Sequence, residues 1–309
     1  MPSIITDQPV VSPTEPKVKD IKETPSVPVQ TKDLPSFSSA ELTNPGAISV
    51  TVADKTTPIV VLFGPPASGK TMTLVRMTRF LQNQGFTIEP VRNFRPAHDA
   101  NYKDICDKFN NMVCSEWAAE LTRGLNFMLI KVSKRGKPIC QILEAPGEYY
   151  FNPADEKEPR KTFVGYIENI IKSPNKKIWI NIVEPDWKDE SDRMKFVKKI
   201  ALLKSKIYRN DKSIFLFNKI DMTEFVYGQG DVYMGPARKY VADNYPGIFL
   251  PFKNPSPITS LWRSYNCRFV PFVTGSYNEV EVAGKTKVKY EEGTDIYPRR
   301  LWTEIGKYL

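Results

Sequence analysis

The stretch covering residues 57–74, TPIVVLFGPPASGKTMTL, constrains the fold more than any other part of this chain. Its apolar run at residues 59–63 predicts a buried strand, and the residues after the loop follow the spacing of a helix. The loop between them has the spacing G-x-x-x-x-G-K-[ST], formed by Gly64, Gly69, Lys70 and Thr71. Such a loop gathers backbone N–H groups into a nest, and the following helix adds the positive end of its dipole. The stretch therefore predicts a loop that binds phosphate groups.

The same spacing predicts a nucleoside triphosphate as the ligand. The Lys70 amine is expected to reach the β- and γ-phosphates and to act in catalysis, and the Thr71 hydroxyl is expected to bind Mg²⁺. The predicted phosphate contacts are Gly64, Ala67, Ser68, Gly69, Lys70, Thr71 and Met72. These residues indicate a triphosphate without identifying its base.

A second motif, Asn218-Lys219-Ile220-Asp221, follows an apolar strand predicted at residues 213–217. In an open α/β sheet the carboxyl ends of the strands form the ligand-binding edge, so this motif is expected near the loop. A carboxylate there can accept hydrogen bonds from N1–H and the 2-amino group of guanine, which adenine cannot offer. Because such a site rejects a base that lacks these donors, Asn218, Lys219 and Asp221 predict guanine.

Together, the two motifs resemble those of the Ras-like P-loop GTPases, a class that includes translation factors. The resemblance runs from residue 57 to the C-terminus, with insertions. It implies a GTP-binding switch with Mg²⁺-dependent hydrolysis of GTP to GDP. It also implies that Thr122 is the switch I threonine, which closes over Mg²⁺ and the γ-phosphate. Thr274 and Gly275, after the last predicted strand, resemble the loop whose backbone contacts the guanine carbonyl group.

Residues 144–148, with the sequence EAPGE, resemble the D-x-x-G motif of switch II, with Glu144 in the place of Asp. The resemblance implies that Glu144 holds Mg²⁺ through a water molecule and that the Gly147 N–H contacts the γ-phosphate. Glu148 stands where many members have the glutamine that orients the attacking water. A carboxylate can act there as a base, but its charge faces a polyanion, so slow hydrolysis is expected.

Strand and helix patterns alternate along the rest of the chain, which predicts a mostly parallel sheet covered on both faces. The fold class is therefore α/β, a three-layer P-loop NTPase fold. The turn at residues 134–137 joins two strands, 125–132 and 138–143, into a hairpin, so one antiparallel edge strand is expected. Insertions are expected at 247–264 and 279–292.

Composition sets the limits of the domain and of its partners. Residues 1–48 are rich in Pro, Ser and Thr and predict a disordered tail, which leaves 49–309 as the folded domain. The net charge of +9 permits contact with nucleic acid, but no RNA-binding signature indicates it. The four cysteines have no paired spacing, so no zinc finger or disulfide scaffold is indicated.

No leader and no apolar run of bilayer length stand out, so a cytoplasmic protein without a transmembrane segment is expected. The expected partners are GTP or GDP with Mg²⁺, and proteins that bind the switch regions or the N-terminal tail.

Two alternatives stay open at the level of sequence. Glu144 and Glu148 are compatible with an interaction module that binds nucleotide with little or no hydrolysis. The long first helix and the extended segment 86–91 are compatible with another P-loop NTPase, such as a phosphotransferase, or with a dimerising GTPase that has an all-parallel sheet. The pairing direction of strand 125–132 separates this last possibility from the hairpin fold.

Overall fold

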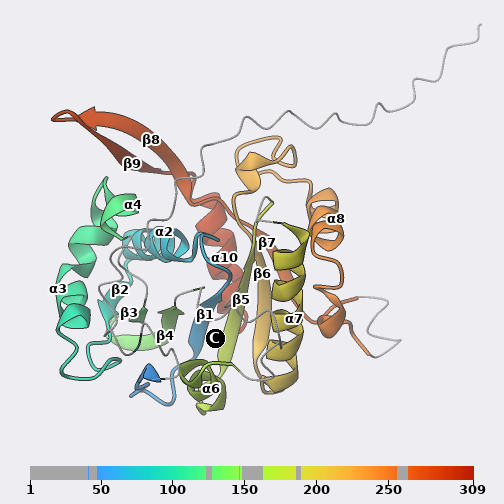
Figure 1. Cartoon of the computed structure of the whole chain (residues 1–309), viewed down its shortest axis with the longest axis horizontal. Coiled ribbons are helices and arrows are strands. Elements are labelled where there is room, and N and C mark those ends of the chain that lie inside the picture. Colours follow the sequence, from blue (N-terminus) through green and yellow to red (C-terminus); the bar gives the residue numbers. More distant parts are fainter. Residues whose placement is uncertain are drawn as a thin grey trace, which may run out of the picture. The chain divides into compact units, whose positions relative to one another are not determined.

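A seven-stranded β-sheet runs through the domain (Figure 1). The structure is a computed structural model that describes residues 41, 47–122, 127–145, 147, 163–185, 189–255 and 264–309. The strands are β1 (Ile59–Phe63), β2 (Thr87–Pro90), β3 (Met128–Lys134), β4 (Lys137–Glu144), β5 (Lys177–Val183), β6 (Lys212–Phe217) and β7 (Arg268–Pro271). Their order is β2-β3-β4-β1-β5-β6-β7, which places the strand before the glycine loop at the centre of the sheet.

Strands β4, β1, β5, β6 and β7 are parallel, whereas β3 is antiparallel to both β4 and β2. This confirms the mostly parallel α/β sheet with an antiparallel strand from the hairpin. The hairpin turns at Arg135 and Gly136, which have φ angles of 51° and 76°. The extended segment predicted at 86–91 forms β2 and pairs outside β3, so β3 lies one position in from the edge. Because β3 is antiparallel, the alternative with an all-parallel sheet is not supported.

Helices cover both faces of the sheet. They are α2 (Lys70–Asn83), α3 (Ala100–Cys114), α4 (Ala118–Leu121), α6 (Gly165–Lys172), α7 (Glu190–Lys206), α8 (Met234–Asn244) and α10 (Ile296–Gly306), with 3₁₀ turns at Ile220–Met222 and Leu250–Phe252. Phe63 and Phe217 point to one face, where their rings contact Phe163 just before α6 and Tyr240 of α8. Helices α2 and α10 contact each other over the opposite face (Figure 1). These three layers match the predicted fold class.

A separate two-stranded hairpin, β8 (Gly275–Val282) and β9 (Lys285–Glu292), leaves the sheet after β7. Its two-residue turn is Ala283-Gly284, with φ angles of 51° and 72°, as the twist of a tight hairpin requires. The insertion expected at 279–292 is therefore most of this hairpin. It packs against α4 (Figure 1), so a segment near the C-terminus lies beside the residues that lead to Thr122.

The residues that precede β1 also contact the domain. Ile48 is buried in the core, and the carboxylate of Glu41 accepts a hydrogen bond of 2.8 Å from the buried Arg95 side chain. Apart from residues 41, 47 and 48, segment 1–48 lies outside the described residues, and the disordered tail stays a prediction. Of the insertion expected at 247–264, the structure describes residues 247–255 and Ser264.

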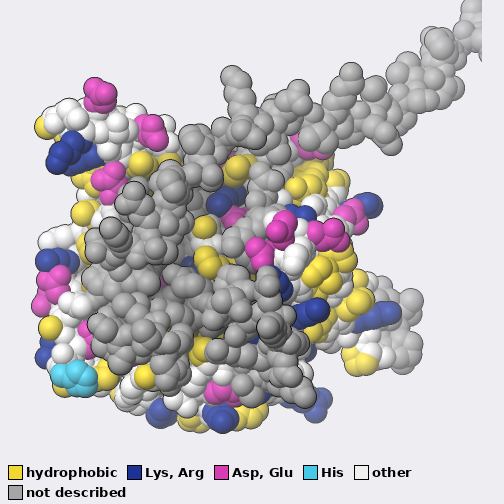
Figure 2. Space-filling model, viewed as in Figure 1, with side chains coloured by type: hydrophobic (Ala, Val, Ile, Leu, Met, Phe, Trp, Pro, Cys, Tyr) yellow, Lys and Arg dark blue, Asp and Glu magenta, His cyan; other side chains and the backbone are white. Residues whose placement is uncertain are grey.

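On the face of the molecule seen in Figure 2, charged side chains of both signs are interspersed. Among the coloured atoms of this face, Lys and Arg side chains lie between Asp and Glu side chains. Cys106, Cys140 and Cys267 are buried free thiols, and Cys114 is an exposed one. Among the described helices, none combines the length and the apolar character that crossing a bilayer demands.

Candidate functional site

The glycine loop joins the carboxyl end of β1 to the first turn of α2. Gly69 immediately precedes the helix with a φ of 82°, a conformation that glycine adopts without strain. At Gly64 a Cβ atom would lie 2.7 Å from Ser68 Oγ and 3.1 Å from the Ile182 side chain, so the loop packs closely on β5. The Lys70 amine crosses the loop and donates a hydrogen bond of 2.8 Å to the Pro65 carbonyl oxygen. The loop thus has the compact form that a phosphate nest needs.

Thr71 and Glu144 come together beside this loop. The Thr71 hydroxyl donates to Glu144 Oε1 over 3.1 Å, and Glu144 is 2% exposed at the end of β4. Two hard oxygen atoms side by side fit Mg²⁺, which binds one or two carboxylates together with water and substrate phosphates. The described residues contain no cluster of three or more His, Cys, Asp and Glu side chains that would hold a metal alone. The donor set therefore fits a metal ion that binds together with phosphates.

Gly147 lies directly against the loop. A Cβ atom at this position would come within 2.5 Å of backbone atoms of Pro65 and Pro66 and within 2.6 Å of the Lys70 amine. Glycine is therefore required for this close approach. Gly147 of the predicted switch II motif thus lies against the glycine loop, whereas Pro146 and Glu148 lie outside the described residues.

Thr122 follows α4 and is buried next to the start of α2. Its hydroxyl donates to the Ala118 carbonyl oxygen and lies 3.8 Å from Met72 Sδ. Thr122 is therefore beside the first turn of the loop helix, as its predicted role needs, while its hydroxyl bonds to α4. Whether Thr122 is a metal ligand stays a prediction.

The Asn218-Lys219 segment follows β6, which β5 separates from β1, and contacts the glycine loop from there. The Asn218 amide donates a hydrogen bond of 2.9 Å to the Ser68 carbonyl oxygen, and the Lys219 amine lies 3.4 Å from the Ala67 carbonyl oxygen. Asn218 Oδ1 and Ser68 Oγ are buried, and the described residues give them no hydrogen-bond partner. Such atoms are rare in folded proteins and need an explanation such as a ligand.

Asp221 lies at the outer end of this segment, in a 3₁₀ turn. Its carboxyl group keeps an exposed surface, yet partial burial raises its pKa above the ordinary value, against the opposing charge of Lys219. Burial of the Tyr277 hydroxyl, with a smaller contribution from the charge of Asp221, raises the pKa of that hydroxyl to about 12, although the residue as a whole is 45% exposed. Tyr277 also exchanges a hydrogen bond of 2.8 Å with the Thr274 hydroxyl. The structure thus brings the predicted base residues Asp221 and Thr274 to one edge, with Tyr277 between them.

Two residues at this edge have no counterpart in the motifs of the sequence. Glu184 directly follows β5, is 4% exposed and forms an ion pair with Lys219. Tyr277 lies two residues after Gly275 and contacts Thr274 with its hydroxyl group. An acid directly after a buried strand is a sequence signal that could have identified Glu184. No local pattern indicates Tyr277, because its place depends on how β8 leaves the sheet.

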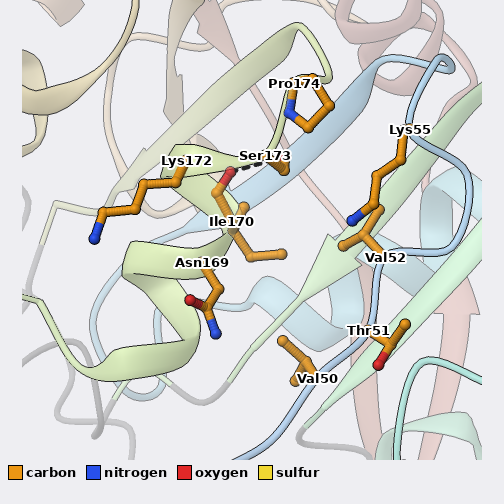
Figure 3. Close-up of a pocket in the computed structure, with 9 residues that line it drawn as sticks. All are labelled: Val50, Thr51, Val52, Lys55, Asn169, Ile170, Lys172, Ser173 and Pro174. Atoms are coloured by element: carbon orange, nitrogen blue, oxygen red, sulfur yellow. Dashed lines mark hydrogen bonds between the residues drawn. The ribbon is translucent and has the colours of Figure 1, made fainter.

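A cavity of about 370 Å³ lies at the opposite edge of the sheet (Figure 3). It is lined by Val50, Thr51, Val52, Lys55, Asn169, Ile170, Lys172, Ser173 and Pro174. These residues precede β1 and β5, whereas the motif residues follow the strands. The cavity and the predicted site are therefore distinct.

No protein-family model matches this chain, and no curated protein sequence matches it. Similar solved structures include nucleolar GTP-binding protein 1 of Plasmodium falciparum, at 11% identity over 73% of this chain and 81% of that one, with a TM-score of 0.36. A Roco2 structure of Methanosarcina barkeri, bound to GDP, is 12% identical over 84% of this chain and 52% of that one, with a TM-score of 0.33. A GTP-binding protein engB is 12% identical over 81% of this chain and 97% of that one, with a TM-score of 0.35. At this level of similarity, function has to be inferred from the residues of the site.

Proposed function

We propose that this chain binds GTP and GDP with Mg²⁺ and acts as a switch that hydrolyses GTP slowly. The observation that carries the proposal is the contact between the two motifs. Asn218 and Lys219 approach the backbone of Ser68 and Ala67 at 2.9 and 3.4 Å, which joins a base site to a phosphate site. A nucleotide spans such a pair of sites, since its base and phosphates lie at opposite ends of the ribose.

Guanine recognition is assigned to Asp221 and to the Thr274-Gly275 loop. The Asp221 carboxylate accepts hydrogen bonds from N1–H and the 2-amino group, and backbone N–H groups of the loop are available to the 6-oxo group. The Lys219 side chain, fixed by Glu184, flanks the base. Adenine reverses the pattern of donors and acceptors, so it would leave Asp221 unpaired.

The phosphates are assigned to the glycine loop, with Lys70 neutralising charge on the β- and γ-phosphates. Thr71 and Glu144 would hold Mg²⁺, which supplies positive charge to the phosphate oxygens when it is bound. Gly147 contacts the loop, and Glu148 is the next residue in the chain, so its carboxylate is the proposed base for the attacking water. Hydrolysis is slow because that carboxylate faces a polyanion.

Ordering of the segments around Thr122 and Gly147 by the γ-phosphate would make the protein a switch. Proteins that bind these segments or the N-terminal tail are the proposed partners, in the cytoplasm. The alternative is a binding module with little or no hydrolysis, which Glu144 and Glu148 also permit. Single-turnover GTP hydrolysis that is faster than GTP dissociation would exclude this alternative.

The test of the proposed function is nucleotide competition. Purified protein with Mg²⁺ should bind a fluorescent GDP, which unlabelled GTP or GDP displaces and ATP does not. Nucleotide released by denaturing the purified protein should be GDP or GTP when analysed by chromatography. Comparable displacement by ATP would contradict the assignment of guanine.

Guanine binding is expected to weaken in mild acid. Because burial raises the Asp221 pKa, the carboxyl group gains its proton at a higher pH than an ordinary Asp does. The protonated carboxyl group has one acceptor fewer, so the affinity for GDP falls as the pH decreases through this pKa. Well above this pKa the affinity is at its full value. Calorimetric titrations from about pH 7 to about pH 4.5 should show a steeper loss for the wild type than for Asp221→Asn, which lacks the titrating group. Equal slopes would show that another group is responsible.

A further inference from the structure

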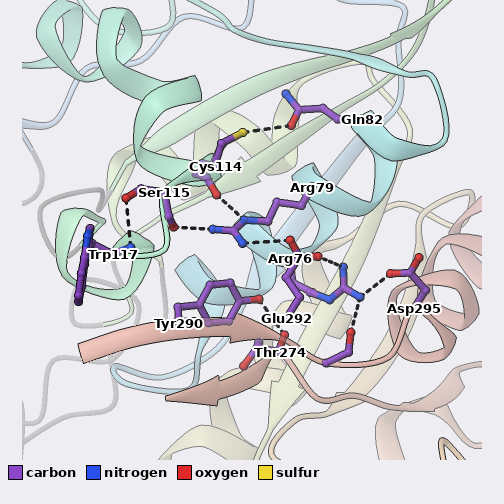
Figure 4. A network of polar contacts seen from close by, with 12 residues as sticks. Arg76, Arg79, Gln82, Cys114, Ser115, Trp117, Thr274, Tyr290, Glu292 and Asp295 are labelled. Carbon is purple, nitrogen blue, oxygen red and sulfur yellow. Dashed lines mark hydrogen bonds and ion pairs between the residues drawn. The ribbon is translucent and has the colours of Figure 1, made fainter. Parts of the chain in front are cut away.

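The β8–β9 hairpin is joined to the proposed base loop by one buried tyrosine. Tyr290 in β9 is 2% exposed, and its hydroxyl donates a hydrogen bond of 2.8 Å to the Thr274 carbonyl oxygen (Figure 4). Its backbone N–H donates a hydrogen bond of 2.7 Å to the carbonyl oxygen of Glu116, which lies in the segment that leads to α4. Tyr290 is therefore held by its backbone while its side chain holds the loop.

The Tyr290 ring contacts side chains of α2 and β8. The Arg79 guanidinium of α2 lies 4.8 Å from the ring centre, and the Tyr277 ring lies 5.6 Å away. Arg79 also donates hydrogen bonds to the Ser115 carbonyl oxygen and to Glu292, over 2.6 and 2.9 Å. The ring is thus fixed against the helix that carries the glycine loop.

A second arginine attaches the end of β9 to the same helix. The side chain of Arg76 is fully buried and donates hydrogen bonds to Glu292, Gly293 and Asp295 over 2.8, 2.9 and 2.6 Å (Figure 4). Hydrogen bonds from a charged donor are about twice as strong as neutral ones. The position of β9 is therefore defined relative to α2, and with it the position of the Tyr290 hydroxyl.

The Thr274-Gly275 loop packs against β9 without leaving space for a side chain at Gly275. A Cβ atom at Gly275 would collide with the Glu291 carbonyl oxygen and lie 2.8 Å from the Tyr290 ring. Gly275 has a φ of 152°, which a residue with a side chain rarely adopts. Gly275 thus brings the backbone into contact with Tyr290.

We propose that Tyr290 is a positioning residue for guanine recognition, which orients the peptide group between Thr274 and Gly275. In a trans peptide the C=O and N–H groups point in opposite directions. When the Tyr290 hydroxyl holds the Thr274 carbonyl group, the Gly275 N–H is directed away from Tyr290 and is available to the 6-oxo group of guanine. This role rests on the proposed function and adds a residue that does not itself touch the nucleotide.

The test is Tyr290→Phe, which removes the hydroxyl and leaves the ring. Tyr102→Phe is the matched control, because Tyr102 is 1% exposed and its hydroxyl donates 2.9 Å to the Val91 carbonyl oxygen, outside the proposed site. Both variants lose one buried tyrosine hydrogen bond, so both should lower the melting temperature by a few degrees. The two variants should differ in their affinity for nucleotides.

Three diphosphates are compared by calorimetry: GDP, IDP, which keeps the 6-oxo group, and 2-aminopurine riboside diphosphate, which lacks it. Tyr290→Phe should weaken GDP and IDP about tenfold, as the loss of one neutral hydrogen bond does, and leave the third unchanged. Tyr102→Phe should bind all three as the wild type does. An equal loss for all three nucleotides, or no loss in Tyr290→Phe, would overturn the role of Tyr290. A wild type that does not distinguish GDP from ADP would instead overturn the proposed function, and this role with it.

Discussion

Asp221→Asn is expected to lower the affinity for GDP about 1000-fold while the affinity for xanthosine diphosphate rises. In the proposed complex the carboxylate accepts from both guanine donors, whereas an amide offers one acceptor and one donor group. Its NH₂ group would face the 2-amino group of guanine, donor against donor. Xanthine carries an oxygen at this position, so the amide can pair with it. The substitution thus changes the preferred base and leaves the phosphate contacts intact.

Competition against a labelled nucleotide measures both affinities with one protein. Glu224→Gln is the matched control, since Glu224 is an exposed acid three residues further along the same segment. It removes the same charge without touching the base site and should keep the preference for GDP. An Asp221→Asn protein that still prefers GDP over xanthosine diphosphate would show that Asp221 does not read the base.

Lys70→Met is expected to reduce the affinity for GDP about 100-fold and that for a non-hydrolysable GTP analogue further. The Lys70 amine lies within the glycine loop, and hydrogen bonds to charged groups contribute about 1.5–3 kcal/mol each. In the proposed complex the amine also reaches the γ-phosphate, so the affinity for GTP should fall more than that for GDP. Met retains most of the apolar stem and removes the cost of burying the Lys70 ammonium group, which offsets part of the loss of its hydrogen bond to Pro65. The folded state should therefore survive.

Fluorescence titration and thermal unfolding together test this prediction. Lys55→Met is the control, because Lys55 is an exposed lysine beside the cavity at the opposite edge of the sheet. It should bind GDP like the wild type. If Lys70→Met binds GDP as tightly as the control does, the glycine loop is not the phosphate site.

Much of the fold was predictable because its signals are local. The apolar runs identify β1, β5 and β6, and the loop residues Gly64–Thr71 follow a strand and begin a helix as predicted. Parallel strands place their carboxyl ends at one edge, so Asn218 and Glu144 come to the loop although they are distant in sequence. Element boundaries are less local: α3 and α4 are separate helices with a break around Ser115.

The contacts of the β8–β9 hairpin could not be predicted in this way. Arg76 and Glu292 are 216 residues apart, and neither belongs to a local pattern that indicates the other. Glu184 and Tyr290 likewise obtain their roles from the strand ends and helices that surround them. Propensity and periodicity report the neighbours along the chain, whereas these residues are defined by neighbours in space.

The sequence by itself determined the glycine loop, the order of the motifs and the α/β class, because each depends on residue type and short-range spacing. The tertiary structure decided where β2 pairs, how Gly147 approaches the loop and how Tyr290 reaches Thr274. Each of these depends on packing between segments that are far apart in the chain. Their geometry is fixed when the core closes, because a close-packed interior admits few arrangements of its side chains.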